Sequence, residues 1–459
     1  MLDQTFTRKT LARHIRRSDP RRFQISGGRS AIEARLKYLE TSISNRNFTF
    51  KHIVTKPAGK SEIVSSKDFG ENLALRKLDD HIRRVYKLRQ ENREEVTKQL
   101  FHLLRESSPK HIIRTDIKSF YESIDTRDIF SNVESNPILS LTSKHIFAQW
   151  KRDAVGNRSG LPRGFGISAS LSELYMQSID RRVRAIRGVY FYARYVDDII
   201  IFSYREPLYV LSDLERILAS TPLELQYEKT ETNTIGACVC LDGCKCSSHK
   251  KKCECDNGKS CKCSKQFDDY AKDVKFPGND RTAPRVGFTY IDYLGYRFYS
   301  QEVNRKEPNK PNTAYISISD QKIKKLKSRI AKTFNKYAEE KNEQLLQDRL
   351  KFLTGSVPIR SQKGRLLSGV PYSYRTIHFS YGRPAFDPDA LDELDRFIRN
   401  CLFNEKWRPG RYARKSLPKR DREKLARLSF KKSFHCHIVH KFNESRIKEI
   451  QKAWIDEQN

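Results

Sequence analysis

The sequence predicts an α+β fold, and two kinds of local pattern lead to that prediction. Residues 190–202 carry apolar and β-branched side chains on both sides of Asp197 and Asp198, which is typical of a strand, a tight turn and a second strand. Residues 111–116 form another short apolar run, which ends in Asp116. Several other segments repeat apolar residues every three or four positions, which indicates helices that bury one face.

The chain is strongly basic. Its 459 residues contain 89 Lys and Arg against 56 Asp and Glu, a formal net charge of +33. Such an excess repels itself unless a polyanion offsets it, so nucleic acid is the expected partner. A membrane surface is the competing partner, but no stretch approaches the roughly 18 apolar residues of a spanning helix, and no signal-like run begins the chain. We therefore expect a cytoplasmic protein with no membrane partner.

Asp197 and Asp198 are adjacent carboxylates at an apolar turn. They repel each other, and burial disfavours their charged forms. A divalent cation between them would offset that cost, whereas an ordinary solvated Asp-Asp turn would avoid it. For this pair alone, both interpretations stay open.

Further motifs lie on either side of this pair. The chain carries, in order, D-I-K-S-F-Y from Asp116, G-L-P-R-G from Gly160, Y-V-D-D from Tyr195, K-T from Lys229 and Y-L-G-Y-R-F from Tyr293. Together they resemble the palm of reverse transcriptases, and the resemblance covers roughly residues 50–300. The chain is most similar to bacterial enzymes, above all the defence-associated (unknown-group) reverse transcriptases, with retron and group II intron enzymes as relatives.

The resemblance implies an α+β right-hand polymerase fold with fingers, an antiparallel palm sheet with packed helices, and a helical thumb. The corresponding regions are 1–109 for a basic N-terminal region and the fingers, 110–236 for the palm, 237–266 for a Cys-rich palm insert, 267–303 for the end of the palm with a primer-grip-like turn, and 304–459 for the thumb and a basic helical C-terminal extension.

In the first region, residues 1–50 are rich in arginine, which fits a solvated helix and a grip on template RNA equally well. Residues 56–64 resemble the fingers hairpin that holds the incoming triphosphate. Related enzymes often carry an arginine two residues beyond Lys60, where this chain has glutamate. Lys60 or Arg76 is therefore the expected triphosphate ligand.

Two helices are predicted next to these motifs. Residues 72–90 place apolar side chains on one face and Arg and Lys on the other. A glycine-rich turn opens the second helix, where Gly164 is expected to let the backbone approach the template and dNTP closely. Ser170 and Glu173 match the capping-box pattern of a helix N-terminus.

The family's chemistry needs two hard cations about 4 Å apart, one to activate the primer 3′-hydroxyl and one to hold the triphosphate. By resemblance, Asp116 and Asp197 are the principal ligands of two Mg²⁺ ions. Asp198 is more peripheral, and the Ile117 carbonyl is available as a further ligand. Lys229, at the position of the family's motif lysine, is expected to protonate the leaving pyrophosphate.

The resemblance also implies three substrate contacts. It places Tyr121 beneath the sugar of the incoming nucleotide, next to Phe120, where a ring leaves no room for a 2′-hydroxyl and so selects deoxynucleotides. Without the resemblance, both aromatics would be assigned to the core. Arg163 stands where family members usually carry Gln, and it is expected either to pair with template phosphate or to mark altered templating.

Eight of the ten cysteines gather between the K-T and Y-L-G-Y motifs. They form four Cys-x-Cys pairs, at Cys238, Cys240, Cys244, Cys246, Cys253, Cys255, Cys261 and Cys263. In a reducing cytosol, thiolates this dense indicate metal ligands rather than disulfides, and soft sulfur favours Zn²⁺. The alternative is a lysine-rich loop whose cysteines have no role.

Two apolar periodicities predict helices in the last region. The first is made by Ile323, Leu326, Ile330, Phe334 and Tyr337, and the second by Leu391, Leu394, Phe397, Ile398, Cys401 and Leu402. Lysines and arginines fill the outer face of the first, as expected for a thumb helix beside a duplex. Residues 406–432 are strongly basic again.

These observations predict an RNA-templated DNA polymerase with two Mg²⁺ ions, dNTPs as substrates, and RNA template and DNA product as partners. A dedicated non-coding RNA or a partner protein is a further expected partner, and the resemblance suggests a role in antiviral defence. The alternatives are a retron or group II intron enzyme, an RNA-synthesising polymerase, which Tyr121 disfavours, and a catalytically silent nucleic-acid-binding palm protein.

Overall fold

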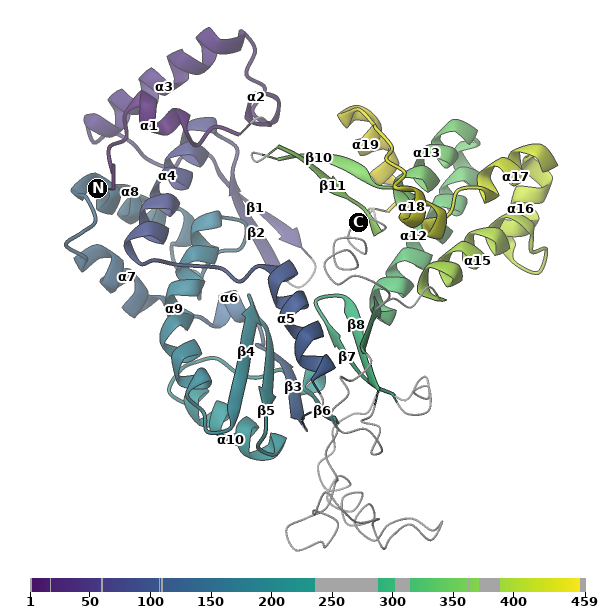
Figure 1. Cartoon of the computed structure of the whole chain (residues 1–459). Coiled ribbons are helices and arrows are strands. Elements are labelled where there is room, and N and C mark those ends of the chain that lie inside the picture. The colour runs from purple at the N-terminus through teal and green to yellow at the C-terminus, as the bar shows by residue number, and fades with distance from the viewer. Residues whose placement is uncertain are drawn as a thin grey trace, which may run out of the picture.

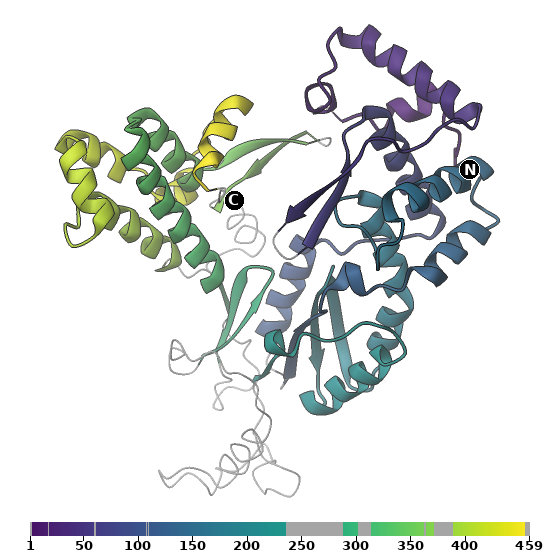
Figure 2. The same cartoon turned by 180° about the vertical axis from the view of Figure 1, so that it is seen from behind.

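The computed structural model describes residues 2–16, 18–58, 61–106, 108, 110–235, 288–301, 314–361, 364–370 and 389–454. Figure 1 shows two lobes side by side, an N-terminal lobe drawn in purple to teal and a helical C-terminal lobe drawn in green to yellow. The view from behind in Figure 2 gives the same arrangement. Strands β7 and β8 lie between the lobes (Figure 1).

The N-terminal lobe combines helices with a hairpin and a four-stranded sheet. Its helices are α1 (Arg8–Ala12), α2 (Asp19–Arg22), α3 (Gly28–Ser44), α4 (Phe69–Val85), α5 (Arg93–Arg105), α6 (Phe120–Ser123), α7 (Thr126–Ser135), α8 (Leu141–Trp150), α9 (Gly166–Arg184) and α10 (Pro207–Leu218), with the short η1 (Lys151–Val155) and η2 (Tyr227–Lys229). Its strands are β1 (Ile53–Ala58), β2 (Ser61–Ser66), β3 (Lys110–Asp116), β4 (Val189–Tyr195), β5 (Asp198–Ser203) and β6 (Glu231–Ile235).

The four-stranded sheet has the order β4-β5-β3-β6, and each neighbouring pair is antiparallel. Side chains of β5 alternate between two cores. Ile199 and Ile201 join the large core with α9 and α10, while Ile200 and Phe202 join a second core with α5. A strand buried on both faces reads as an uninterrupted apolar run, which is the pattern seen in residues 199–202. The predicted strand–turn–strand is confirmed.

A second, three-stranded sheet has the order β7-β8-β9, formed by β7 (Phe288–Tyr293), β8 (Tyr296–Gln301) and β9 (Ala314–Ile318). Its apolar side chains share one core with α5 and with one face of the four-stranded sheet. Asn233 of β6 donates to the Tyr290 carbonyl of β7 at 3.0 Å. The predicted Y-L-G-Y turn is therefore the β7–β8 hairpin, and it lies against the sheet that carries the aspartates.

Both predicted N-terminal helices exist, with different boundaries. The helix predicted for residues 72–90 is α4, which begins at Phe69 because Asp68 accepts a hydrogen bond from the Glu71 amide. The capping-box prediction for Ser170 and Glu173 is wrong. Helix α9 begins at Gly166, so both residues lie inside it, and Glu173 binds Arg194 instead.

The C-terminal lobe has its own core, separate from those of the sheets. Its elements are α12 (Asp320–Glu340), α13 (Glu343–Thr354), β10 (Val357–Ser361), β11 (Gly364–Ser368), α15 (Asp389–Phe403), α16 (Arg408–Ser416), α17 (Lys419–Ala426), α18 (Phe430–Cys436) and α19 (Glu444–Lys452). The apolar residues that predicted α12 and α15 lie in or against this core, so both helices are confirmed.

Two predictions fall outside the described residues. They are the Cys-rich insert, with all eight of its cysteines, and Lys60. The zinc site therefore stays a prediction, which elemental analysis of the purified protein would test. In the part of the chain that the structure describes, none of the helices is long and apolar enough to cross a membrane.

Candidate active site

The β3–β5 pairing brings the three predicted catalytic aspartates together. Asp116 ends β3 and is paired in register with Asp198, the first residue of β5. Asp197 lies in the turn between β4 and β5, where its carbonyl accepts a hydrogen bond from the Ile117 amide at 3.2 Å. Asp116 and Asp197, which are 81 positions apart in the chain, thus lie together at one end of the two central strands, β3 and β5.

These carboxylates lie in a partly desolvated place, which changes their acidity. Burial raises the pKa of Asp197, and the negative charges of Asp116 and Asp198 raise it further. Burial also raises the pKa of Asp198, although Arg114 partly offsets this by favouring the charged form. Like charges that share a buried site favour protonation unless a cation joins them.

Two cations reach the aspartates. The Lys229 ammonium lies 3.1 Å from a carboxylate oxygen of Asp116. Arg114 lies 3.7 Å from Asp198 and 3.5 Å from Glu231, so its guanidinium bridges neighbouring strands. Sequence reasoning missed Arg114. The available signal was its spacing of two residues from Asp116, which places both side chains on one face of β3.

The donor set suits a hard divalent cation. Three carboxylates supply only oxygen ligands, as Mg²⁺ prefers. For Asp197 and Asp198, burial and the neighbouring carboxylate charge outweigh the nearby cations, so the pKa of each is raised. Asp116, Asp197 and Asp198 are the residues that would hold Mg²⁺. The neighbouring Ile117 is buried, and its amide is bonded to the aspartate turn.

Phe120 and Tyr121 follow Asp116 on the short helix α6. Phe120 is buried in the large core, whereas Tyr121 is only partly buried, and the two rings meet edge to face with centroids 5.4 Å apart. Burial raises the pKa of the Tyr121 hydroxyl, and the charges of Glu173 and Asp197 act in the same direction. The tyrosine thus lies within electrostatic reach of the aspartate turn.

Arg163 binds a carboxylate of this protein. Its guanidinium makes two hydrogen bonds to Glu122, at 2.7 and 2.9 Å, and lies 5.6 Å from the centre of the Tyr121 ring. Its carbonyl accepts a hydrogen bond from Val64 of β2 at 2.7 Å. Arg163 therefore links the β1–β2 hairpin to the turn that carries Tyr121.

Two glycines permit this close packing. Gly160 (φ +70°) and Gly164 (φ +109°) both have left-handed backbones. A Cβ on Gly160 would lie 2.2 Å from the Tyr121 carbonyl oxygen, and one on Gly164 would lie 2.4 Å from that of Val64. At both positions, glycine is required because the backbone of another segment of this protein lies too close for a Cβ.

Comparison with known proteins adds to this geometry. Residues 54–298, more than half of the chain, match the model of the reverse transcriptase (RNA-dependent DNA polymerase) family. The chain belongs to the reverse transcriptase family. The match begins in β1 and ends in β8, so it includes the three aspartates, Tyr121 and Arg163.

Other comparisons find weaker likenesses. A solved structure of apo telomerase from Candida tropicalis, truncated from its C-terminal domain, has a TM-score of 0.27 and 15% sequence identity to this chain. The likeness covers 40% of this chain and 42% of that one, so the chain spans less than half the length of this telomerase. No curated protein matches the chain.

Arg76, one of the two residues predicted for triphosphate binding, does not contact the aspartates, and the other, Lys60, lies outside the described residues. Arg76 makes two hydrogen bonds to the buried Asp19, at 2.6 and 3.0 Å, and a third to the His14 carbonyl. It thereby ties α4 to α2.

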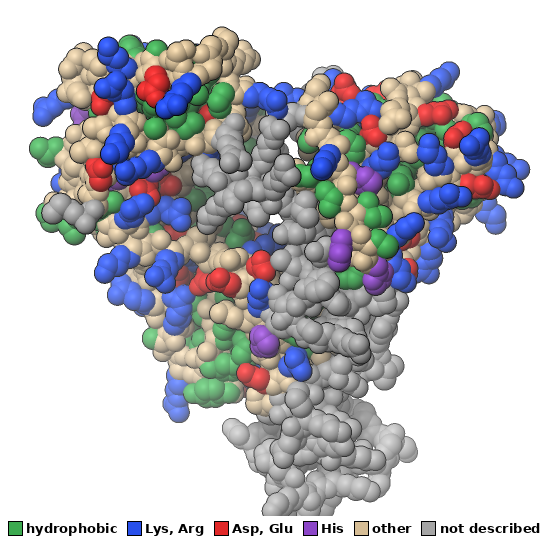
Figure 3. Space-filling model, turned by 45° about the horizontal axis from the view of Figure 1, so that its top comes forward, with side chains coloured by type: hydrophobic (Ala, Val, Ile, Leu, Met, Phe, Trp, Pro, Cys, Tyr) green, Lys and Arg blue, Asp and Glu red, His purple; other side chains and the backbone are tan. Residues whose placement is uncertain are grey.

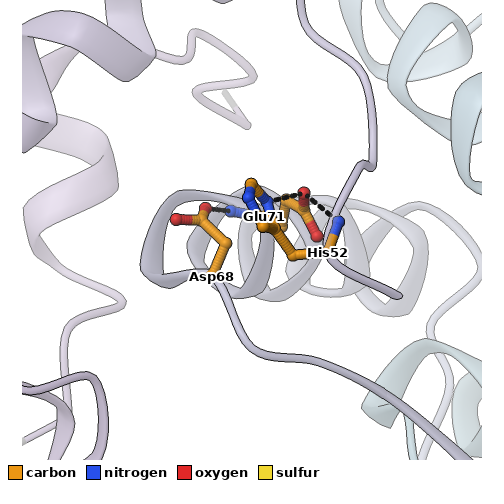
Figure 4. Close-up of side chains that lie close together, drawn as sticks. All are labelled: His52, Asp68 and Glu71. Atoms are coloured by element: carbon orange, nitrogen blue, oxygen red, sulfur yellow. Dashed lines mark hydrogen bonds and ion pairs between the residues drawn. The ribbon is translucent and has the colours of Figure 1, made fainter. Parts of the chain in front are cut away.

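One tight group of potential metal ligands lies away from the aspartates. The ligand atoms of His52, Asp68 and Glu71 all fall within 4.8 Å of one another (Figure 4). Glu71 accepts hydrogen bonds from the amides of Lys51 and His52 and from the His52 ring, while Ser66 donates to its other oxygen. These contacts explain the group as an anchor for the start of α4.

The β7–β8 turn also reaches the aspartates. The Tyr293 hydroxyl donates to the backbone carbonyl of Asp198 at 3.1 Å, and Tyr293 is fully buried. Arg93 of α5 donates to the Leu294 carbonyl in the turn itself. The turn that resembles the family's primer grip is therefore fixed directly to the strand that carries Asp198.

Proposed function

We propose that this protein is an RNA-templated DNA polymerase that joins nucleotides with the help of two Mg²⁺ ions. The observation that carries the proposal is that Asp116, Asp197 and Asp198 lie together at the end of two paired central strands, β3 and β5, in a chain of the reverse transcriptase family. Bound Mg²⁺ would activate the primer 3′-hydroxyl and neutralise the triphosphate.

Each nearby side chain has a distinct role in this proposal. Lys229, held 3.1 Å from Asp116, carries the proton that the leaving pyrophosphate requires. Tyr121 forms the wall beneath the sugar of the incoming nucleotide. Arg114 partly neutralises Asp198, which the resemblance makes the more peripheral of the metal ligands.

The surface suits a nucleic-acid duplex. Figure 3 shows Lys and Arg side chains over both lobes of the face that it presents. Lys324 and Lys325 are exposed on α12, and the outer sides of α16 and α17 expose Arg411, Arg414, Lys415, Lys419, Arg420 and Lys424. Such surfaces bind phosphate and release counterions. In this proposal the C-terminal lobe acts as the thumb and the β1–β2 hairpin as part of the fingers.

Replacing Asp197 and Asp198 together with Asn tests the proposal. Mg²⁺-dependent dNTP incorporation on an RNA template with a DNA primer should fall more than about a hundredfold, which is about 2.7 kcal/mol of barrier. Binding of the primer–template should persist, because the basic surfaces are unchanged.

The matched control is Asp213→Asn. Asp213 lies on α10, where its carboxylate pairs with Arg205. Its activity should equal that of the wild type. If the double variant keeps activity within about tenfold, the aspartates are not the metal ligands. If it loses primer–template binding as well, the effect is structural.

Tyr121→Ala tests whether the product is DNA rather than RNA. Removing the ring opens the space that a 2′-hydroxyl would occupy, so the ratio of kcat/KM for dNTP over NTP should fall at least about tenfold. The Phe120 ring and the metal ligands are untouched. A wild type that prefers NTPs would support the RNA-synthesising alternative instead.

The role in antiviral defence rests on the resemblance to defence-associated enzymes. Bacteria that express the wild type should show fewer phage plaques than bacteria that express the Asp197→Asn, Asp198→Asn variant. Equal plaque counts would contradict this role and favour the retron or group II intron alternative. Sequencing of copurified nucleic acid would identify the template or a dedicated non-coding RNA.

A further inference from the structure

The aspartate turn contains a backbone conformation that its residue does not favour. Val196 has φ +63°, in the left-handed region, and it directly precedes Asp197. For a residue other than glycine this conformation costs roughly 1–2 kcal/mol, and a β-branched side chain makes it rarer. Such strain persists only where the surroundings hold it.

Arg194 supplies the contact that holds this turn. One terminal nitrogen of its guanidinium donates to the Val196 carbonyl at 2.8 Å. The same nitrogen donates to Glu173 at 3.3 Å, and the second terminal nitrogen donates to Glu173 at 2.7 Å and to Asp180 at 2.9 Å. The remaining Nε donates to Asp180 at 3.0 Å. All five N–H groups of the guanidinium therefore have an acceptor.

These contacts lie in the interior. The side chain of Arg194 is 3% exposed, and those of Glu173 and Asp180 are 13% and 12% exposed. Both carboxylates come from the same helix, α9, seven residues or about two turns apart, so they lie on one face. Tyr192 of β4 donates to Asp180 at 2.6 Å and completes the network.

We propose that Arg194 is a positioning residue that ties the Val196 carbonyl to helix α9 and so holds Asp197 in the geometry that binds the catalytic metal ions. In the described structure its hydrogen bonds go to Glu173, Asp180 and the Val196 carbonyl and not to Asp116, Asp197 or Asp198, so it acts only through the turn. The inference rests on the proposed function.

Arg194→Lys keeps the positive charge but removes the planar guanidinium with its five N–H donors. A single ammonium cannot satisfy two carboxylates and also reach the Val196 carbonyl in the same geometry. The matched control is Arg184→Lys, on the last turn of α9. Arg184 lies over the ring of Tyr192, with 5.1 Å from its guanidinium carbon to the ring centre, and it pairs with Glu91 at 3.7 Å rather than with the turn.

The experiment measures metal binding directly, by electron paramagnetic resonance of free Mn²⁺ during titration of the protein, and separately the Mg²⁺ dependence of dNTP incorporation. We expect Arg194→Lys to weaken Mn²⁺ binding and raise the half-saturating Mg²⁺ concentration by at least about tenfold. The affinity for primer–template and the KM for dNTP should stay within about twofold of the wild type, as should all values for Arg184→Lys.

A folded Arg194→Lys protein with wild-type Mn²⁺ binding would overturn the proposal. If that variant does not fold, Glu173→Gln replaces it, because its amide turns an N–H donor toward the guanidinium while Asp180 still neutralises the arginine. Weaker Mn²⁺ binding in folded Glu173→Gln supports the proposal, and unchanged binding overturns it. A wild type that binds Mn²⁺ but incorporates no nucleotide contradicts the proposed function alone.

Discussion

Two tight turns lie close to Asp198, the β4–β5 turn directly before it and the β7–β8 turn next to Tyr293, which bonds to its carbonyl, and their backbones differ. The β4–β5 turn places Val196 at φ +63°, and the β7–β8 turn places Leu294 at φ +50°. In each turn an arginine donates to the carbonyl of the left-handed residue: Arg194 in the first and Arg93 in the second.

The residue that follows differs. In the β7–β8 turn it is Gly295, at φ +76°, which accepts a left-handed backbone without steric cost. In the β4–β5 turn it is Asp197, a proposed metal ligand, which is not among the residues with a positive φ. The β7–β8 turn therefore has two consecutive left-handed residues, one of them glycine, whereas the β4–β5 turn has one, and it is a valine.

The charges around the two arginines differ as well. Arg194 lies between two buried carboxylates, whereas Arg93 lies beside Lys322, and both of these cations lie over the ring of Tyr296. Burial and the neighbouring charge of Arg93 lower the pKa of Lys322 to about 8. The surroundings of the β7–β8 turn are thus cationic, whereas those of the aspartate turn are anionic.

The largest change in stability is expected from a substitution at Gly295 in the β7–β8 turn. Gly295→Val should lower the stability of the protein by about 1–2 kcal/mol, because a β-branched residue would have to adopt a left-handed backbone. A Cβ there meets only the ends of Arg93 and Lys322, at 3.5 and 3.6 Å, so overlap adds little. Denaturant unfolding measures the change.

The reciprocal variant, Val196→Gly, is the control. It removes strain but adds backbone freedom in the unfolded state worth about 0.5–1 kcal/mol, so its stability should stay within about 1 kcal/mol of the wild type. If both variants lose equal stability, the two turns do not differ in the way described.

A smaller effect is expected from Asp197→Asn in metal-free buffer. Because burial and Asp116 raise the pKa of Asp197 in the folded state, its ionisation costs stability as pH rises through that raised pKa. The variant lacks this cost, so its Tm should exceed that of the wild type by roughly 1–3 °C at neutral pH and by less at about pH 3, where the carboxyl is mostly protonated in both states.

Addition of Mg²⁺ provides the contrast, because it should raise the Tm of the wild type and not that of the variant. A variant that is less stable than the wild type at neutral pH without metal would show that Asp197 has a cationic partner in the folded protein.

The smallest effect should come from Tyr293→Phe, which removes one hydrogen bond between the two turns. The loss should be about 1 kcal/mol of stability, the usual range for a single buried hydrogen bond. Activity should fall only severalfold, since Asp198 keeps its β-sheet pairing with Asp116. A loss of activity as large as that of the aspartate variants would mean that the β7–β8 turn positions Asp198 directly.

Local patterns in the sequence determined much of the site. The resemblance of the ordered motifs to reverse transcriptases identified Asp116, Asp197, Asp198 and Lys229, while local periodicity predicted the strand–turn–strand that carries Asp197 and Asp198. The structure brings all four together. The apolar repeats of α4, α12 and α15 likewise appear in the sequence, because a helix buries a side chain every three or four residues.

Only the tertiary structure decided which charges meet. Arg163 contacts Glu122, Arg76 contacts Asp19, and Arg194 joins α9 to the aspartate turn. The partners of Arg76 and Arg163 lie dozens of residues away in the chain. With 89 Lys and Arg and 56 Asp and Glu in the sequence, each carboxylate has many possible partners. Which pair forms depends on how helices and strands pack, because a buried charge is tolerated only where that packing delivers an opposite charge within hydrogen-bond distance.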